Sequence, residues 1–372
     1  KSNVGADVLE PDYIAQRNKE SRAGKGVALI AILLISTFFI LAGCIGQEED
    51  QITTTTTPVT KTEDSQKVRL AYLRGDLHHL AFFVALDKGW YSEAGLDVET
   101  PEFENGMQEM LGFGAEAVDI GYLGIAPSLV QFLNAKIDIT VVAGVNQEGS
   151  AIIVGANTDI QSVADLVGKK FAIPGIGTVQ HFLALMALEQ HGLSRTDLFG
   201  GNFIETSVIN MEPALQRGGA SGGIDAFIAW EPFDAKAVGN EVGRYLIMSR
   251  EVWPHHPCCV IAVRTQFLET HPEVVQKVVT IHAKATNWIL NHPIDAALTF
   301  RKYADLPQKV VELAMENIEF IKVPDIQGIQ QYLEKLIEYG VITEGNVPAN
   351  IATFLAQFIN EVFLEEALKI YP

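Results

Sequence analysis

The chain has 372 residues, 48% hydrophobic and 20% charged, so it is long enough for two or three domains with cores of their own. Its 27 basic and 46 acidic residues give a formal net charge of −19. A chain this acidic, with no basic cluster after its first 25 residues, repels phosphate backbones, and we therefore expect no nucleic-acid partner. Its three cysteines are too few for a disulfide framework.

The N-terminal segment has the pattern of an export signal. Residues 27–42 form an uncharged apolar run after a basic stretch, and their length suits a signal peptide better than a membrane span of about 20 residues. The run ends in LAGC at residues 41–44, which resembles the lipobox of bacterial and archaeal lipoproteins. We predict a signal peptide with an N-terminal extension over residues 1–43 and a lipid anchor on Cys44. An uncleaved signal anchor is the alternative, and both place the rest of the chain on the extracytoplasmic face of the cell membrane.

A polar segment follows the predicted anchor. Residues 44–67 contain three consecutive acidic residues and a run of five threonines, with almost no bulky apolar side chains. Such a segment cannot bury enough surface to offset the entropy lost on ordering. We therefore expect a flexible tether that holds the following domain away from the membrane.

From residue 68 onward, short apolar runs alternate with helical patterns. Strands are expected at 68–73, 96–99, 119–122, 137–145, 152–154, 170–173, 203–207, 225–229 and 258–263. Helices are expected at 80–94, 107–113, 125–133, 180–191, 211–217, 272–290, 295–303, 308–318, 325–339 and 348–363. This alternation predicts an α/β fold of two lobes, each a mainly parallel sheet flanked by helices. Lobe 1 would comprise 68–155 and 258–372, and lobe 2 would comprise 156–257.

Four segments resemble the periplasmic-binding-protein family that serves nitrate, sulfonate, taurine, bicarbonate and thiamine-precursor ABC transporters. They are LAFFVALDKGWYSEAGL (80–96), DIGYLGIAPSL (119–129), GKKFAIPGIGTVQHF (168–182) and DAFIAWEPF (225–233). The resemblance covers nearly all of residues 67–372. It implies a type II periplasmic-binding-protein fold whose lobes close on a small oxyanionic or heteroaromatic solute without catalysis or a cofactor. Its partners would be separate permease and ATPase subunits.

Ligands of open α/β sheets bind beyond the carboxyl ends of the strands, so the loops after the strands are candidate sites. After the first strand come Asp76, His78 and His79. Asp76 is equally suited to cap the next helix, and two adjacent histidines on a cleft loop are candidate ligand contacts.

The loop after the strand at 119–122 offers three further candidates, Tyr122, Gly124 and Ile125. Gly124 would let backbone N–H groups approach a ligand. In the family that the chain resembles, this loop lines the site, and the alternative for Tyr122 is packing between the lobes.

The glycine-rich turn at residues 174–181 has the clearest mechanism. Its glycines expose backbone N–H groups, Thr178 can cap the next helix, and the helix dipole favours an oxyanion. The resemblance assigns ligand contacts to Gly177, Thr178 and Gln180, with His181 beside them. The turn matches neither the Walker loop nor GxGxxG, and the alternative is an ordinary capped turn.

Two further segments close the list of candidates. Trp230 offers a flat apolar wall, whereas Glu231 is better suited to an inter-lobe or loop-closing contact than to an anionic ligand. His256, at the expected hinge, is a candidate donor in the cleft.

Cys258 and Cys259 begin a predicted strand, so we expect their side chains to point to opposite faces. We rank buried thiols first, a vicinal disulfide second and a metal site third, and we expect no bound metal. The thiols and histidines nevertheless keep a metal-capturing protein as one alternative. Another is an enzyme similar to thiamine-pyrimidine synthases, which use a cysteine-rich segment and histidine. The export signal opposes the enzyme, because those synthases act inside the cell.

Overall fold

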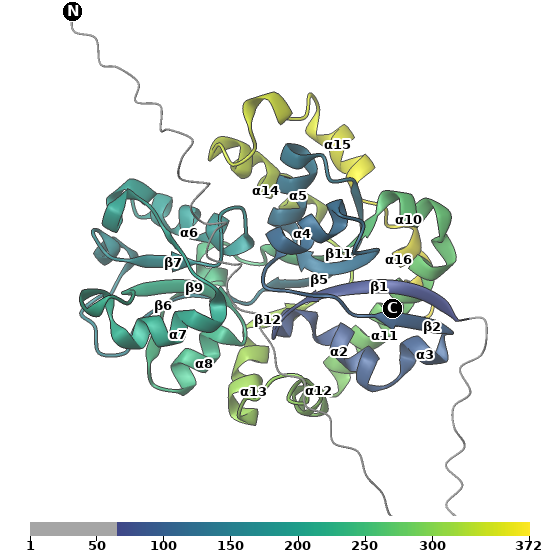
Figure 1. The fold of residues 1–372 in the computed structure, drawn as a ribbon, viewed down its shortest axis with the longest axis horizontal. Helices are drawn as coiled ribbons and strands as arrows, with labels where there is room; N and C mark the ends of the chain where they lie inside the picture. The colour runs from purple at the N-terminus through teal and green to yellow at the C-terminus, as the bar shows by residue number, and fades with distance from the viewer. Residues whose placement is uncertain (1–64) are drawn as a thin grey trace, which may run out of the picture. The chain divides into compact units, whose positions relative to one another are not determined.

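The computed structural model describes residues 65–372, which all lie within one structural unit of the chain. The predicted signal peptide, Cys44 and the tether up to residue 64 lie outside the described residues. Two β-sheets, each covered by helices, form lobe 1 and lobe 2 of this unit (Figure 1). Within residues 65–372, none of the helices is both long and apolar enough to cross a membrane.

Lobe 1 is built on a seven-stranded sheet in the order β12-β5-β11-β4-β1-β2, with β3 also paired to β1. β1 is parallel to β2, β3 and β4, whereas β11 is antiparallel to β4 and β5, and β12 is antiparallel to β5. Its strands are β1 (Gln66–Leu73), β2 (Leu96–Glu99), β3 (Glu102–Phe103), β4 (Ile120–Gly124), β5 (Ile139–Glu148), β11 (Pro257–Arg264) and β12 (Ile318–Phe320).

Lobe 2 is built on a five-stranded sheet in the order β10-β6-β9-β7-β8. β7 is parallel to β8 and β9, whereas β6 is antiparallel to β9 and β10. Its strands are β6 (Ser150–Gly155), β7 (Phe171–Ile173), β8 (Ile204–Glu205), β9 (Ala226–Trp230) and β10 (Gly243–Met248).

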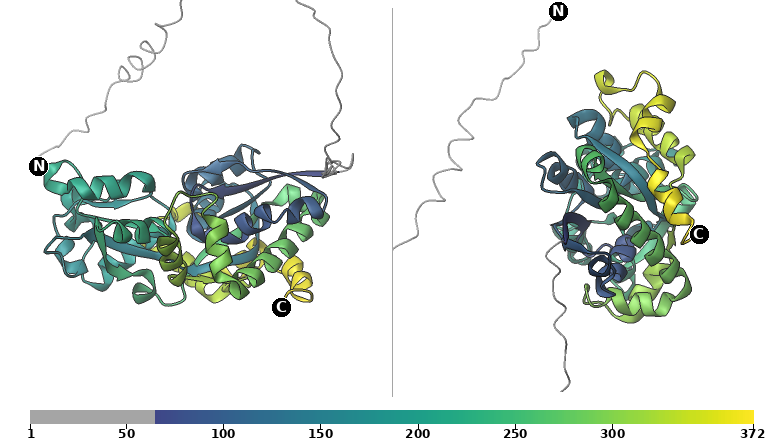
Figure 2. Two further views of the ribbon diagram at one scale, coloured as in Figure 1. Left: turned by 90° about the horizontal axis from the view of Figure 1, so that it is seen from below. Right: turned by 90° about the vertical axis from the view of Figure 1, so that its right-hand side faces the viewer.

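Helices cover the sheets and bury the strands between them. In lobe 1, α4, α5 and α14 pack together above the sheet in the view of Figure 1, and α2 and α11 pack together below it. The C-terminal helices α15 and α16 both pack on β5 of lobe 1. Figure 2 shows this C-terminal segment in yellow. The helices of lobe 1 are α2 (Leu80–Asp87), α3 (Trp90–Glu93), α4 (Gly106–Gly114), α5 (Ile125–Ala135), α10 (Thr265–Thr270), α11 (Pro272–Asn291), α12 (Pro293–Phe300), α13 (Gln308–Glu316), α14 (Ile326–Glu338), α15 (Ile351–Phe358) and α16 (Val362–Leu368). Those of lobe 2 are α6 (Val179–Gln190), α7 (Val208–Arg217), α8 (Phe233–Gly239) and α9 (Ser249–Val252).

Each sheet is mixed, not mainly parallel as the pattern suggested. The reason is that each contains a strand arriving directly from the other lobe, and this strand runs antiparallel to its neighbours. β6 enters lobe 2 from β5, and β11 returns to lobe 1. Because β6 belongs to the second sheet, the first crossing lies at Gly149 and not near residue 155, where we expected it.

Two predicted helices are each divided in the structure. The helix expected at 80–94 breaks at Gly89, whose φ of 71° does not continue a helix. The helix expected at 348–363 breaks after α15, where Ile359 bridges to β5 and the N–H of Asn360 donates to Val141 O. A tertiary backbone contact thus overrides a continuous helical pattern.

Candidate functional site

A small buried cavity lies where the two lobes meet. Its volume is about 20 Å³, close to the space of one water molecule, so it has no room for a larger molecule in this arrangement. Both lobes line this inter-lobe cavity, through Leu73, Asp76, His78, Gly106, Gly124, Pro127, Thr178, Val179, Gln180, Trp230, Cys258 and Cys259. Four larger hollows have volumes of about 630, 730, 390 and 420 Å³, and the last two are lined from both lobes. None of the four contains a predicted site residue.

The structure brings six of the predicted residues together at this cavity and places six others away from it. Those that line it are Asp76, His78, Gly124, Thr178, Gln180 and Trp230. Those that do not are His79, Tyr122, Ile125, Gly177, His181 and His256.

Asp76 both caps a helical turn and lines the cavity. Its Oδ1 accepts the N–H of His78 at 2.9 Å, which caps the 3-10 turn Leu77–His79, and its side chain also lines the cavity. Burial raises the pKa of Asp76 to about 7, against the opposing effect of His78. This carboxyl group is therefore partly protonated near neutral pH.

His78 is held between the two lobes. Its Nε2 lies 2.9 Å from Gly149 O, and its Nδ1 lies 3.5 Å from Asp76 Oδ1. Burial lowers the pKa of His78, but Cys258 and Asp76 outweigh this effect and raise that pKa to about 9.

His79 lies beneath the same loop and not at the cavity. Its Nδ1 accepts the N–H of Leu73 at 3.2 Å, and within the described part of the chain its Nε2 has no hydrogen-bond partner. Burial, together with the charge of His78, lowers the pKa of His79 well below its ordinary value. This imidazole is therefore neutral and supports the loop.

Tyr122 and Ile125 are core residues of lobe 1. The hydroxyl of Tyr122 lies 3.3 Å from His282 Nδ1, and the centroid of its ring lies 5.9 Å from that of Phe82. Tyr122 sits inside β4, and the cavity is reached at the end of the strand, by Gly124. The packing alternative thus describes Tyr122, although within lobe 1 and not between the lobes.

The glycine turn uses most of its polar groups internally. Thr178 Oγ1 accepts the N–H of His181 at 3.2 Å and caps α6, and the N–H of Gly177 donates to His181 Nδ1 at 3.2 Å. The N–H of Ile176 donates to Glu205 Oε2 at 3.3 Å. These N–H groups, which the sequence suggested for an oxyanion, already have partners.

Gln180 and His181 follow on α6 with different environments. Gln180 Nε2 donates to Ser150 Oγ at 3.1 Å beside the cavity. Burial and the charge of Arg195 lower the pKa of His181 to about 4, so its imidazole is neutral and accepts the Gly177 N–H.

Trp230 and Glu231 end β9 at the lobe junction. Trp230 is only 2% exposed and lines the cavity, and among residues 65–372 its indole Nε1 has no partner. Glu231 makes the expected inter-lobe contact: its Oε1 accepts Asn317 Nδ2 at 2.6 Å, and its carbonyl accepts the N–H of Leu77 at 3.1 Å.

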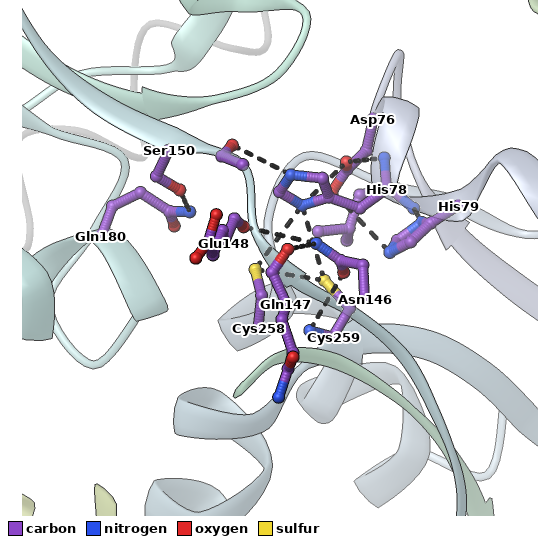
Figure 3. Close-up of polar contacts among 12 residues, drawn as sticks. Asp76, His78, His79, Asn146, Gln147, Glu148, Ser150, Gln180, Cys258 and Cys259 are labelled. Atoms are coloured by element: carbon purple, nitrogen blue, oxygen red, sulfur yellow. Dashed lines mark hydrogen bonds and ion pairs between the residues drawn. The ribbon is translucent and has the colours of Figure 1, made fainter. Parts of the chain in front are cut away.

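The two adjacent cysteines converge, which contradicts the expectation of opposite faces. Their sulfur atoms are 3.8 Å apart and lie 3.6 and 3.8 Å from His78 Nδ1, and both thiols are free and buried (Figure 3). The pairing of β11 with β5 shifts register on both sides of Cys259, so strict alternation fails there. His256, just before the strand, is buried, and the centroid of its ring lies 6.1 Å from that of Trp253. It does not line the cavity.

Sequence reasoning missed Leu73, Gly106, Pro127 and Val179 at the cavity. Gly106 begins α4, which Asn105 caps by accepting the N–H of Gln108 at 3.0 Å. A Cβ on Gly106 would lie 2.6 Å from Pro127 Cγ, so this position needs glycine. The Asn-Gly pair before a helical pattern was the available signal.

Comparison with known proteins agrees with this architecture. The model of the NMT1-like family matches residues 61–300. A putative aliphatic sulfonates-binding protein of Bacillus subtilis is 28% identical over 298 residues, which cover 77% of this chain and 82% of the relative.

Two solved structures share the fold. The alkanesulfonate-binding protein SsuA of Xanthomonas axonopodis, bound to MOPS, has a TM-score of 0.68 at 19% identity over 81% of this chain and all of that chain. The periplasmic nitrate-binding protein NrtA of Synechocystis has a TM-score of 0.72 at 15% identity over 82% of this chain and 89% of that chain. The predicted two-lobed periplasmic-binding-protein fold is confirmed, and the chain belongs to the NMT1-like family.

Proposed function

We propose that this protein is the solute-binding subunit of an ATP-driven importer, which encloses a small oxyanionic or heteroaromatic solute between its lobes and delivers it to a permease. Its relatives are named as sulfonate- and nitrate-binding proteins. The observation that carries the proposal is a cavity lined from both lobes, into whose wall Trp230 brings a buried indole N–H without a partner in the described chain. Such a donor costs free energy unless a ligand accepts from it.

Closure of the lobes is the proposed mechanism. Two of the bonds that link the lobes involve Glu231, from Leu77 N–H to its carbonyl and from Asn317 to its carboxylate. Tyr339 and Lys335 at the end of α14 also contact Glu189 of α6. A solute that contacts residues of both lobes favours this state over an open one, and the permease would recognise the closed form.

The polar lining favours recognition by hydrogen bonds. Among the described residues that line the cavity, none is Lys or Arg, whereas Trp230 and Gln180 carry neutral donors. We propose binding without chemical conversion, a role supported by relatives that are binding proteins.

Lipid attachment completes the proposal. The LAGC sequence at residues 41–44 supports cleavage before Cys44 and a lipid on its thiol, with the tether placing the lobes outside the cytoplasm. Mass spectrometry of the protein from membranes tests this step. We expect an N-terminal peptide that begins at a lipidated Cys44, and an intact residue 1–43 segment would contradict it.

The solute class is tested by thermal denaturation of the full chain with nitrate, bicarbonate, taurine, alkanesulfonates, the thiamine pyrimidine and riboflavin. A true ligand at 100 times its Kd stabilises the native state by about 2.7 kcal/mol and raises Tm. We expect one class to do so, with no product formed. No stabilisation by any of them, together with turnover of a thiamine precursor, would instead favour the enzyme.

A further inference from the structure

Three ligand atoms of the metal-binding type meet in the wall of the inter-lobe cavity. Cys258 Sγ, Cys259 Sγ and His78 Nδ1 form a triangle with sides of 3.8, 3.6 and 3.8 Å (Figure 3). Their residues are 1%, 4% and 1% exposed, respectively. These three residues are called the thiol–imidazole cluster below.

The dimensions of this triangle suit a tetrahedral ion. With Zn–S bonds of about 2.3 Å and Zn–N bonds of about 2.0–2.1 Å, tetrahedral angles place two sulfurs about 3.8 Å apart and sulfur and nitrogen about 3.6 Å apart. The observed separations match these values closely. An ion could therefore bind without movement of the backbone.

The orientation of His78 also suits metal binding. A carbonyl oxygen can only accept, so the 2.9 Å contact with Gly149 O places a proton on Nε2 and turns Nδ1 toward the sulfurs. A backbone carbonyl on the second ring nitrogen is the usual support of a metal-bound histidine. A Cβ on residue 149 would lie 2.2 Å from His78 Nε2, so glycine is needed for this contact.

The convergence of the sulfurs is built into the strand. The N–H of Cys259 donates to Asn146 Oδ1 at 3.2 Å, and the register of β11 against β5 shifts at this residue. Asn146 is itself held by donation from Nδ2 to Glu148 O at 3.3 Å. The bulge thus brings onto one side two thiols that regular alternation would separate.

We propose that Cys258, Cys259 and His78 bind one thiophilic cation of the zinc class, with its remaining coordination position facing the inter-lobe cavity. Two thiolates and an imidazole select Zn²⁺ or Cu⁺ over Mg²⁺ and Ca²⁺. The cavity beside the cluster has room for about one water, which is enough for a fourth ligand. The inference does not depend on the identity of the transported solute.

Cobalt substitution is the direct test, because Co²⁺ reports thiolate ligands by their charge-transfer absorption. We expect the reduced full chain to bind one Co²⁺ with this absorption and Zn²⁺ to displace it. Cys258→Ser, Cys259→Ser and His78→Gln should each weaken Zn²⁺ binding more than about a hundredfold, beyond the usual cost of losing an outer ligand.

Two matched controls separate this site from other donors. In the unprocessed, unlipidated chain, Cys44→Ser removes a thiol outside the described residues. His255→Gln alters the exposed group Glu148, His255 and Glu319, whose atoms could also hold an ion. Both variants should bind like the wild type. Absence of the thiolate absorption, its persistence in Cys258→Ser,Cys259→Ser, or its loss in His255→Gln would overturn the proposal.

Alkylation of the wild type gives a second measurement that needs no folded variant. Zn²⁺ should slow modification of Cys258 and Cys259 more than tenfold, whereas Mg²⁺ should not. Equal rates with both ions, or a freshly purified chain lacking two hydrogens because the pair is oxidised, would contradict a thiolate metal site.

Discussion

The buried indole of Trp230 carries the solute-binding proposal at the scale of one residue. Replacing it in Trp230→Phe keeps an aromatic wall but removes the donor, so solute affinity should fall about fivefold, which equals about 1 kcal/mol for one neutral hydrogen bond. Calorimetric titration measures this change. Trp288→Phe, on α11 and away from the cavity, is the control and should bind normally. Equal affinity of all three proteins would remove Trp230 from the site.

His282 predicts a pH dependence of stability. Burial lowers its pKa to about 4 from 6.5, so the unfolded chain binds the proton more readily between these values. The free energy of unfolding should therefore fall as pH decreases from 6.5 to 4, by on the order of 1 kcal/mol per pH unit. We measure the free energy of unfolding of the wild type and of His282→Gln by urea denaturation. The difference between the two proteins should change between pH 6.5 and pH 4. A constant difference would contradict a neutral buried imidazole.

Some residues could be placed from the sequence because local chemistry decides them. Thr178 follows a glycine turn before a helical pattern, and it caps α6 as expected. Cys259 could not be placed, because the bulge depends on Asn146, which is distant in sequence. Tyr122 was ambiguous for a similar reason, since its partner His282 comes from a helix far along the chain.

At the scale of elements, the crossing between β5 and β6 depends on Gly149. Gly149→Ala should lower the free energy of unfolding more than Gly168→Ala, measured by urea denaturation. Both glycines have positive φ, of 80° and 68°, so both variants pay a backbone cost of about 1–2 kcal/mol. Only at Gly149 would the Cβ also meet His78, at 2.2 Å, whereas Gly168 has open space. Equal losses of unfolding free energy in the two variants would show that the His78 side chain moves away from the added Cβ at no cost.

The sequence pattern predicted most strands and helices, including the two-residue edge strand β8, but it missed β3, β10 and β12. β4 is buried throughout and is bounded by turn residues, which makes it recognisable. β3 and β12 contain two and three residues, too few to show a period, and they form through pairing with β1 and β5. The mixture of parallel and antiparallel strands in each sheet was also missed. Local sequence patterns do not indicate which lobe a neighbouring strand comes from, and therefore do not indicate its direction.

At the scale of the whole molecule, Asn317 links the lobes through Glu231. Among the described residues, Asn317→Ala leaves Glu231 Oε1 with only the Tyr245 hydroxyl at 3.4 Å. The free energy of unfolding should therefore fall by about 1–3 kcal/mol. Asn240→Ala is the control, because it breaks an exposed 2.6 Å bond to Glu212 within lobe 2. Urea denaturation should show a clearly smaller loss for this control. A similar loss of unfolding free energy in Asn317→Ala and Asn240→Ala would mean that the inter-lobe bond stabilises the protein no more than an exposed bond within one lobe.

The architecture and the general place of the site followed from the sequence, because alternating strands and helices place loops at the ends of the sheets. The cavity between the lobes was not predictable, since its lining combines β1, β4, α4, α5, α6, β9 and β11 from both lobes. The formal net charge of −19 likewise did not indicate that the described residues lining the inter-lobe cavity include no lysine or arginine.

The most direct test of the account is a crystal structure of the protein grown with the solute that raises its Tm most. The account predicts electron density for the solute between the lobes, in contact with Trp230 and Gln180. Density confined to the outer surface of one lobe, with the inter-lobe cavity unchanged, would contradict it.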